Sequence, residues 1–405
     1  MFNTDQKRHR KKPGSENNIF SDTTLSLTLS LIIISSTLPS AYAGEKIMID
    51  NEKSISLGLA FRSSFAITED GAPNGSSASK DFSVDNMEVR LDGQFNNHIK
   101  ATLNAERTSD GQLRVQDAIA KFEFNDDFNL WLGRMLIPSD RANLSGPFYT
   151  NVWEYPGVVS RYPSLGSGRD NGLLIWGKPG DGKIVYSLGV FNGHNRAAGG
   201  SNDSSSLLYA TRVAVNFFDP ESAPAYYVSN TYYGKNRVLT LGASYQFQKD
   251  GVGLSPTASN DFNGWNIDFL FEDVLGPGVL TVDGAYYKYE LNGQVDCGSG
   301  EPGSMPCVDD QNMGNQVEGN GYLATLAYLF PQKIGIGHFQ PFLRQQQFNR
   351  DISVTVNKQL DFGINYIINK HSARISAVYS QLKDDRLTLA NNDIDKFVIG
   401  FQLQY

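Results

Sequence analysis

The chain of 405 residues lacks the long apolar runs that a membrane-spanning helix requires. Only 40% of its residues are hydrophobic, and its mean hydropathy is −0.34. No stretch reaches the roughly 18 to 20 consecutive apolar residues of such a helix, which excludes helical membrane transporters. Basic residues are also in short supply, since 35 lysines and arginines face 43 acidic residues for a net charge of −8. Without a basic patch, no nucleic-acid partner is expected.

Cysteine and histidine are scarce as well. The two cysteines, Cys297 and Cys307, lie in a stretch rich in glycine and proline, which predicts a loop disulfide formed in an oxidising compartment. A metal site built on them would need two further ligands, and the five histidines are too far apart to supply them with a recognisable spacing. Zinc-protease and serine-hydrolase motifs are missing too. We therefore expect no metal, no cofactor and no enzymatic activity.

The segment 1–43 has the features of a secretory signal peptide. A basic stretch, residues 7–12, precedes an apolar run, residues 25–38, that is too short for a permanent anchor. Ala41-Tyr42-Ala43 offers a signal peptidase small residues at the two positions that it reads. We predict cleavage at this point, so that residues 44–405 form the mature domain. Export agrees with the predicted disulfide.

The mature chain is rich in alternation with a period of two. Near the C-terminus, for example, Ala373, Ile375 and Ala377 alternate with Arg374 and Ser376, as expected for a β-strand whose side chains point alternately to opposite faces. No segment with a helical period competes with this pattern. Sixteen strands are expected, at residues 54–67, 82–95, 98–107, 113–124, 128–134, 170–177, 183–191, 207–217, 237–247, 262–272, 279–289, 319–330, 338–348, 354–367, 371–381 and 394–405.

The segments between these strands alternate in length. Tight turns such as Asn96-Asn97 follow most even-numbered strands, and longer loops such as 135–169 and 248–261 follow most odd-numbered ones. An even strand number with this asymmetry is typical of outer-membrane barrels. Such a sheet must close, because a free strand edge finds no hydrogen-bond partner in hydrocarbon. We predict an all-β fold, a 16-stranded antiparallel transmembrane β-barrel with short periplasmic turns, long extracellular loops and a polar lumen.

One connector breaks the alternation. Residues 218–236 follow an even-numbered strand but form a long, tyrosine-rich segment. This segment either plugs the periplasmic mouth or lies in the aromatic belt at the membrane interface, and the sequence leaves both positions open. A secreted soluble β-sandwich or β-helix would also show alternation. However, a sandwich rarely needs sixteen strands with one-sided loops, and the chain has no fixed-period repeat.

From about residue 84 onward, a series of short sequence motifs resembles the motifs of one known family and follows the same order along the chain. The motifs are Gln116-Asp117-Ala118, Lys121–Phe124, Leu132-Gly133-Arg134 with Pro138, Arg169–Gly172, Tyr186–Gly193, Phe217–Glu221 and Leu239–Gly242. In these motifs the chain is similar to the phosphate-selective porin O/P family. The resemblance implies a sixteen-strand, trimeric porin in which the third loop folds into the lumen and basic side chains select anions.

The third loop corresponds to residues 135–169. Its candidate constriction residues are Arg141, Arg161, Arg169, Tyr149 and Tyr162. We interpret Arg141 and Arg161 as lining the constriction, because the arginine fork binds phosphate or carboxylate with two hydrogen bonds. The same chemistry would equally let them pin the loop to the barrel wall. The loop contains no lysine, whereas the constriction of the family is typically rich in lysine.

Strand parity places a further set of basic residues on the inner face. These lumen candidates are Arg90, Lys100, Lys121, Arg212 and Arg374. Arg212, for instance, lies between Thr211 and Val213, which the alternation turns outward. Most of these bases have carboxylates nearby on the same face. They form either an ion pathway or a cross-strand ion network that makes the wall rigid.

We expect an outer-membrane porin whose water-filled channel admits small hydrophilic solutes by passive diffusion, with anions such as phosphate among them. The expected location is the bacterial outer membrane, with membrane lipid and the solutes as partners. The resemblance adds a homotrimer. The alternative is a barrel that serves as a conduit or sheath for a periplasmic partner, in export or electron transfer.

Overall fold

The computed structural model describes residues 46–108, 111–160, 162–163, 168–194, 205–255, 258–292, 318–385 and 393–405. The predicted signal peptide (residues 1–43), the predicted disulfide between Cys297 and Cys307, and Arg161 therefore lie outside the described residues. Within the described ranges, no helix is long and apolar enough to cross a membrane.

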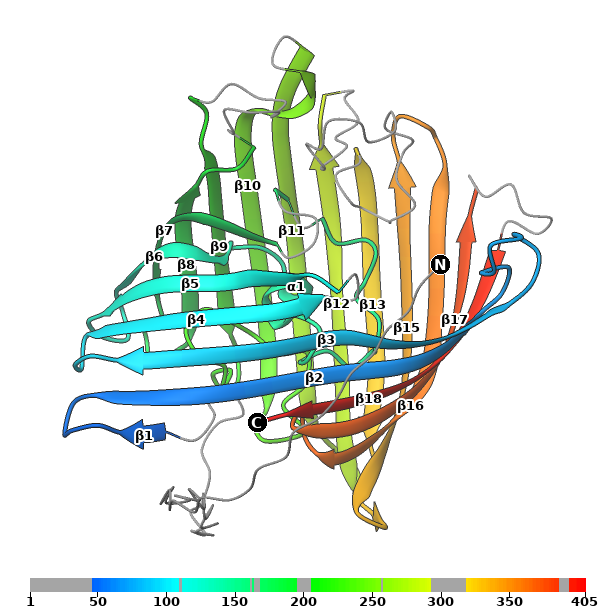
Figure 1. Ribbon diagram of the computed structural model, residues 1–405, viewed down its shortest axis with the longest axis horizontal. Helices are drawn as coiled ribbons and strands as arrows, with labels where there is room; N and C mark the ends of the chain where they lie inside the picture. The colour runs from blue at the N-terminus through cyan, green and yellow to red at the C-terminus, as the bar shows by residue number, and fades with distance from the viewer. Residues whose placement is uncertain are drawn as a thin grey trace, which may run out of the picture. The chain divides into compact units, whose positions relative to one another are not determined.

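One antiparallel sheet closes on itself to form a barrel (Figure 1). Each long strand pairs with the next long strand, and the last pairs with the first, because Ile399 of β18 lies opposite Phe65 of β2. The long strands are β2 (Ser54–Thr68), β3 (Ser79–Gln94), β4 (Ile99–Thr108), β5 (Leu113–Glu123), β6 (Asn129–Leu136), β7 (Arg169–Gly177), β8 (Ile184–Phe191), β9 (Leu208–Asn216), β10 (Val238–Ser255), β11 (Ala258–Leu275), β12 (Gly278–Glu290), β13 (Gly319–Leu329), β15 (Gly337–Arg350), β16 (Val356–Asn369), β17 (Ala373–Asp384) and β18 (Asp393–Gln404). Two short strands, β1 (Lys46–Met48) and β14 (Lys333–Ile334), pair with β2 and β15. The predicted 16-stranded antiparallel barrel is confirmed.

The predicted long loop at residues 248–261 is wrong. Strands β10 and β11 continue through most of this range, where Val252 lies opposite Asn260. A register shift between Gln248 and Val252 interrupts the ladder. Residues 249–251 face Asp261 alone at this point, and Asp250 has a positive φ of 52°, so the alternation is interrupted and the continuation of the strands does not show in the sequence pattern.

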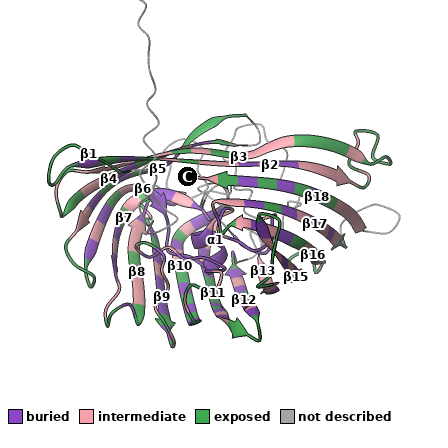
Figure 2. Cartoon of the chain, turned by 90° about the horizontal axis from the view of Figure 1, so that it is seen from below, coloured by how far each residue is buried: buried purple, intermediate pink, exposed green. Residues whose placement is uncertain are grey.

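The barrel is apolar outside and polar inside. In β18, Ile399 and Phe401 are exposed to 45% and 38%, whereas Gln402 is buried. In β11, the exposed Ile267 precedes the buried Asp268. Figure 2 shows the strands banded by this change of exposure. A continuous exposed apolar surface suits contact with hydrocarbon.

Tight turns gather at one end of the barrel. Before β4, the Asn96 side chain accepts hydrogen bonds from the backbone N–H groups of His98 (2.9 Å) and Ile99 (2.8 Å). Such local bonds are why asparagine favours turns. Outer-membrane barrels place their short turns in the periplasm, so this end is the periplasmic end.

Two segments enter the barrel. The first, residues 137–168 between β6 and β7, is called the inner loop and contains the short helix α1 (Arg141–Ser145). The Asp140 side chain caps α1 by accepting a hydrogen bond from the Asn143 backbone N–H, and all five helix residues are buried. The second, residues 217–237 between β9 and β10, is called the inner connector. Figure 2 shows α1 within the ring of strands.

Candidate functional site

The inner loop is held against the wall by side chains that reach it from strands around the barrel. Four arginines and three side-chain amides donate to its backbone carbonyls: Gln246 to Pro138, Arg212 to Ser139, Gln402 to Phe148, Arg374 to Thr150, Asn365 to Asn151, Arg62 to Trp153 and Arg344 to Glu154. Buried loop carbonyls need such partners, and arginine supplies several donors at once. The loop therefore covers the wall formed by β9, β10, β15–β18 and β2.

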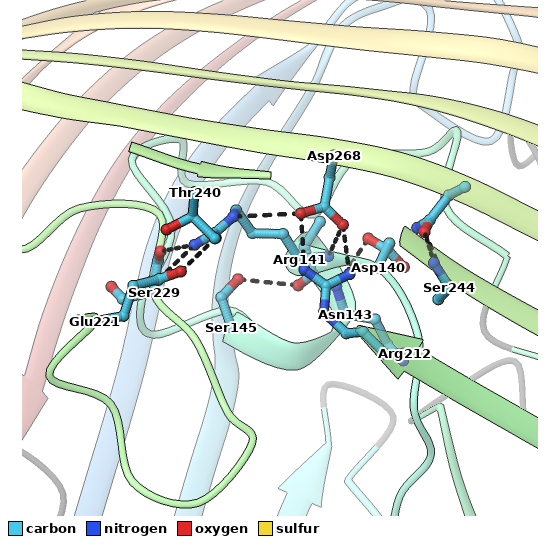
Figure 3. Close-up of polar contacts among 12 residues, drawn as sticks. Asp140, Arg141, Asn143, Ser145, Arg212, Glu221, Ser229, Thr240, Ser244 and Asp268 are labelled. Atoms are coloured by element: carbon cyan, nitrogen blue, oxygen red, sulfur yellow. Dashed lines mark hydrogen bonds and ion pairs between the residues drawn. The ribbon is translucent and has the colours of Figure 1, made fainter. Parts of the chain in front are cut away.

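A buried ion network joins the start of α1 to the wall and to the inner connector (Figure 3). Arg212 Nη2 donates to Asp268 Oδ1 at 2.8 Å. Arg141 Nη2 lies 2.7 Å from Glu221 Oε1, and Arg141 Nε lies 3.6 Å from Asp268 Oδ1. Burial opposes ionisation of the Glu221 carboxyl, but the Arg141 guanidinium outweighs burial and holds the pKa of Glu221 below its ordinary value.

The carboxyl group of Asp140, which caps α1 beside this network, has a raised pKa, in contrast to Glu221. Burial, with a further contribution from the nearby Asp268 charge, raises the pKa of Asp140 to about 6. Asp140 still accepts the hydrogen bond from the backbone N–H of Asn143 at 3.2 Å. The carboxyl groups of Asp140 and Asp268 thus lie near one another, and Arg141 and Arg212 supply the opposite charge.

The inner connector lies in the lumen and meets the inner loop there. The Asn230 backbone N–H donates to the Tyr149 carbonyl at 3.0 Å, and the Asn151 side chain donates to the Asn230 carbonyl at 3.0 Å. On the wall, the Glu272 carboxylate accepts from the backbone N–H groups of Tyr232 (3.0 Å) and Gly234 (2.9 Å). Of the two positions that the sequence left open, the structure shows the connector inside the barrel.

His371, from the turn between β16 and β17, contacts both the inner loop and the inner connector. His371 Nε2 lies 3.0 Å from the Thr231 carbonyl. Its ring packs between Tyr149 and Tyr233, with ring centroids 4.9 Å and 4.7 Å away. Burial, with a further contribution from the charge of Arg374, lowers the pKa of His371 to about 3. The imidazole is therefore neutral at physiological pH and joins three segments without adding charge.

The inner face of β3 is the part of the wall that stays open. Its inward side chains, from Asn86 to Gln94, are all partly exposed. By contrast, inward side chains under the inner loop are buried, as Arg374 shows with 0% exposure. Solvent therefore reaches the lumen along β3.

Basic side chains on and beside this open wall are paired with carboxylates. The N–O distances are 2.6 Å for Arg90–Asp92, 3.9 Å for Lys121–Asp92, 2.6 Å for Lys100–Glu123 and 2.8 Å for Arg169–Asp117. The exposure of the four basic side chains runs from 11% for Lys121 to 36% for Lys100. The open wall therefore presents charges of both signs to the solvent.

Aromatic rings stand beside the open wall. Tyr227 of the inner connector packs on Trp131 with a centroid distance of 6.0 Å, and Lys121 Nζ lies 4.4 Å from the Trp131 ring. Burial, with a further contribution from the Asp117 charge, raises the pKa of Tyr227 above its ordinary value. Burial and the Glu88 charge do the same for Tyr149. The charges of Asp117 and Glu88 therefore act on these two phenols.

The structure divides the sequence-predicted residues into two groups. Arg90 lies on the open wall, and Lys100, Lys121 and Arg169 lie beside it, with Lys121 largely buried. Arg141, Arg212 and Arg374 are buried around the inner loop. Tyr149 lies in the inner loop beside His371, and Tyr162 is buried against Phe262 with stacked rings 3.8 Å apart. Among the described residues no cluster of histidine, cysteine, aspartate and glutamate fits a metal ion.

Sequence reasoning missed two arginines that contact the inner loop. Arg62 and Arg344 are both buried, and each donates to a backbone carbonyl of that loop. Strand parity was the available signal, since Arg62 lies between Phe61 and Ser63 on the opposite face. Parity identifies an inward position, but it does not tell what will cover that position.

Comparisons with known proteins agree with this architecture. The family model described as phosphate-selective porin O and P matches residues 55–405. Among solved structures, the chain is similar to an anion-selective porin from Comamonas acidovorans (14% identity, TM-score 0.57, 87% of this chain and 100% of that chain). It is also similar to the outer-membrane channel DcaP of Acinetobacter baumannii (12% identity, TM-score 0.54, 90% and 100%). A third similar structure is the trimer form of OmpT from Vibrio cholerae (11% identity, TM-score 0.52, 88% and 100%).

At such identities, the likeness to solved structures shows the fold alone. No curated protein matches the chain. The family model, however, spans the barrel from its first long strand to the last residue. The chain therefore belongs to the phosphate-selective porin O and P family, and it is a channel of the bacterial outer membrane.

Proposed function

We propose that this porin admits small hydrophilic solutes by passive diffusion, and that they pass along the inner face of β3. The observation that carries the proposal is the contrast in exposure between the two sides of the lumen. The inward side chains of β3 are partly exposed, whereas Arg374 and the other inward residues under the inner loop are buried. A pore lined with polar and charged groups replaces part of the hydration shell of a solute.

Anions such as phosphate are among the solutes that we propose. The family name and the anion-selective porin from Comamonas acidovorans support this part of the proposal. The advantage of anions over cations should nevertheless be small. Each of the four bases at the open wall has a carboxylate within 4.0 Å, and a wall with balanced charge gives little selection by sign.

Reversal potentials across a planar bilayer in a salt gradient test this proposal. The wild-type channel should show a reversal potential close to zero. Arg90→Gln should shift the potential toward cation selectivity and Asp92→Asn toward anion selectivity, because each leaves its partner unbalanced on a partly exposed wall. Arg237→Gln is the matched control, because Arg237 also pairs with an aspartate, at 2.7 Å, but is 60% exposed. A strong cation selectivity that added phosphate does not change would contradict the admission of anions.

We further propose that the chain works in lipid as a homotrimer, without catalysing a reaction. One similar structure is a trimer form, and the exposed apolar side chains of the outer face suit both lipid and subunit contacts. The alternative function as a sheath for a periplasmic partner is less favoured. The inner loop and the inner connector already occupy the lumen and bind each other through Asn230 and Asn151.

A further inference from the structure

We infer that the open wall binds zwitterionic solutes of the amino-acid class, through Arg90 and Glu88 of β3. The inference rests on the proposed channel function and names a solute class for the same path. Arg90 and Glu88 are successive inward residues, so their Cα atoms are about 7 Å apart along the strand. Both side chains are partly exposed to the lumen.

Each of these two side chains keeps one atom available to a solute. Arg90 donates to Asp92 through Nε (2.6 Å) and Nη2 (3.1 Å), and no hydrogen bond of its Nη1 is seen within the described ranges. Glu88 Oε2 accepts a hydrogen bond from Asn104 at 3.2 Å, and its Oε1 has no partner in the described part of the chain. A guanidinium donor and a carboxylate acceptor therefore stand side by side on one face.

The neighbouring charges favour a solute that carries an ammonium beside its carboxylate over a solute that carries a carboxylate alone. An anion at Arg90 competes with Asp92, whose carboxylate also lies 3.9 Å from Lys121 Nζ. At Glu88, the charge of Arg169 opposes a cation, whereas the nearby charges of Glu106 and Asp117 attract it. A solute that carries both an ammonium and a carboxylate pairs with Glu88 and Arg90 together, so that neither of its own charges is left unpaired in a partly desolvated site.

Two aromatic side chains near the open wall complete the site. Tyr227 from the inner connector packs on Trp131, whose ring centroid lies 4.4 Å from Lys121 Nζ, and the charges of Glu88 and Arg90 act on the phenol of Tyr149 from the inner loop. Their rings offer an apolar surface, and their phenol groups offer hydrogen bonds to the body of the solute. The site therefore combines two opposite charges with an amphipathic face.

Channel block in planar bilayers tests the inference. Serine, glycerate, serinol and glycerol are probes of similar size, and at neutral pH they are zwitterionic, anionic, cationic and neutral. Each is added to a channel that conducts potassium chloride. The concentration of serine that lowers the conductance by half should be at least about 10-fold lower than the concentration of glycerol with the same effect. This difference is expected for charge-assisted hydrogen bonds. Equal block by all four probes would overturn the inference.

Variants separate this inference from the channel function. Arg90→Gln and Glu88→Gln should each weaken block by serine about 10-fold, and Arg90→Lys should restore part of it. Arg237→Gln changes the last residue of the inner connector, which is 60% exposed and pairs with Asp273 instead of with the open wall, so this variant should leave the block unchanged. A protein that inserts but does not conduct would refute the proposed function. A conducting channel in which Arg90→Gln and Arg237→Gln respond to serine alike would refute only the zwitterion site.

Discussion

Gly400 of β18 lies under the indole ring of Trp153 of the inner loop, so closely that a Cβ atom there would overlap the ring. Trp153 is itself tied to the wall, because its Nε1 donates to Asp85 Oδ2 at 3.1 Å. The Arg62 guanidinium lies 4.0 Å from the centroid of the same ring. Glycine at this inward position lets the loop approach the strand closely.

Gly400→Ala should displace Trp153 and loosen the inner loop. We expect a loss of about 1–3 kcal/mol in the free energy of unfolding, the usual cost of overpacking, together with an altered single-channel conductance. Urea unfolding in detergent and bilayer recording measure the two effects. Gly93→Ala is the control, since the nearest atom to its added Cβ is Phe95 Cε2 at 3.9 Å. Equal effects of the two substitutions would contradict the close contact with Trp153.

Two aspartates of β11 allow a matched test of buried against exposed ion pairs. Asp268 pairs with Arg212 and is 1% exposed, while Asp273 pairs with Arg237 and is 25% exposed. Asp268→Asn should lower the free energy of unfolding by about 3–5 kcal/mol, because it leaves buried guanidinium charge without a partner. Asp273→Asn should cost about 1 kcal/mol or less. Denaturant titration of both variants checks the difference, and similar losses would count against the buried network.

Stability should fall in acid through His371. Its pKa is about 3 in the folded protein and 6.5 in its ordinary state, so the unfolded chain binds a proton that the folded chain excludes. The stabilisation by the neutral ring is therefore complete above pH 6.5 and is lost as the pH falls toward 3. Unfolding measured between pH 7 and 4 should show a smaller decline for His371→Gln than for the wild type. Parallel declines would mean that other groups carry the pH dependence.

Glu272 holds the inner connector in place by accepting hydrogen bonds from the backbone of Tyr232 and Gly234. Glu272→Ala should release the connector and give a larger, noisier single-channel conductance, because the periplasmic side of the lumen is then less obstructed. Bilayer recording at fixed voltage measures the change. Asp273→Ala is the neighbouring control, since Asp273 bonds instead to Arg237 at 2.7 Å. An unchanged conductance in Glu272→Ala would show that the connector does not obstruct the path.

The sequence by itself determined the barrel, its number of long strands and which residues of a strand face inward. Alternation with a period of two is local, because the pleat of a strand turns neighbouring side chains to opposite faces whatever lies around it. This is why Arg90 and Arg374 both look like inward bases in the sequence. The bulge between Gln248 and Val252 shows where that local signal stops.

Only the tertiary structure decided which inward residues solvent can reach. Arg374 is buried because the inner loop covers it and offers it the Thr150 carbonyl, 224 positions away in the chain. Arg90 faces the open lumen because the same loop lies against β9, β10, β15–β18 and β2 and leaves β3 uncovered. The course of the loop results from many hydrogen bonds between distant segments, and their partners meet only when the barrel has closed. The pattern of neighbouring residues in the sequence therefore does not predict such contacts.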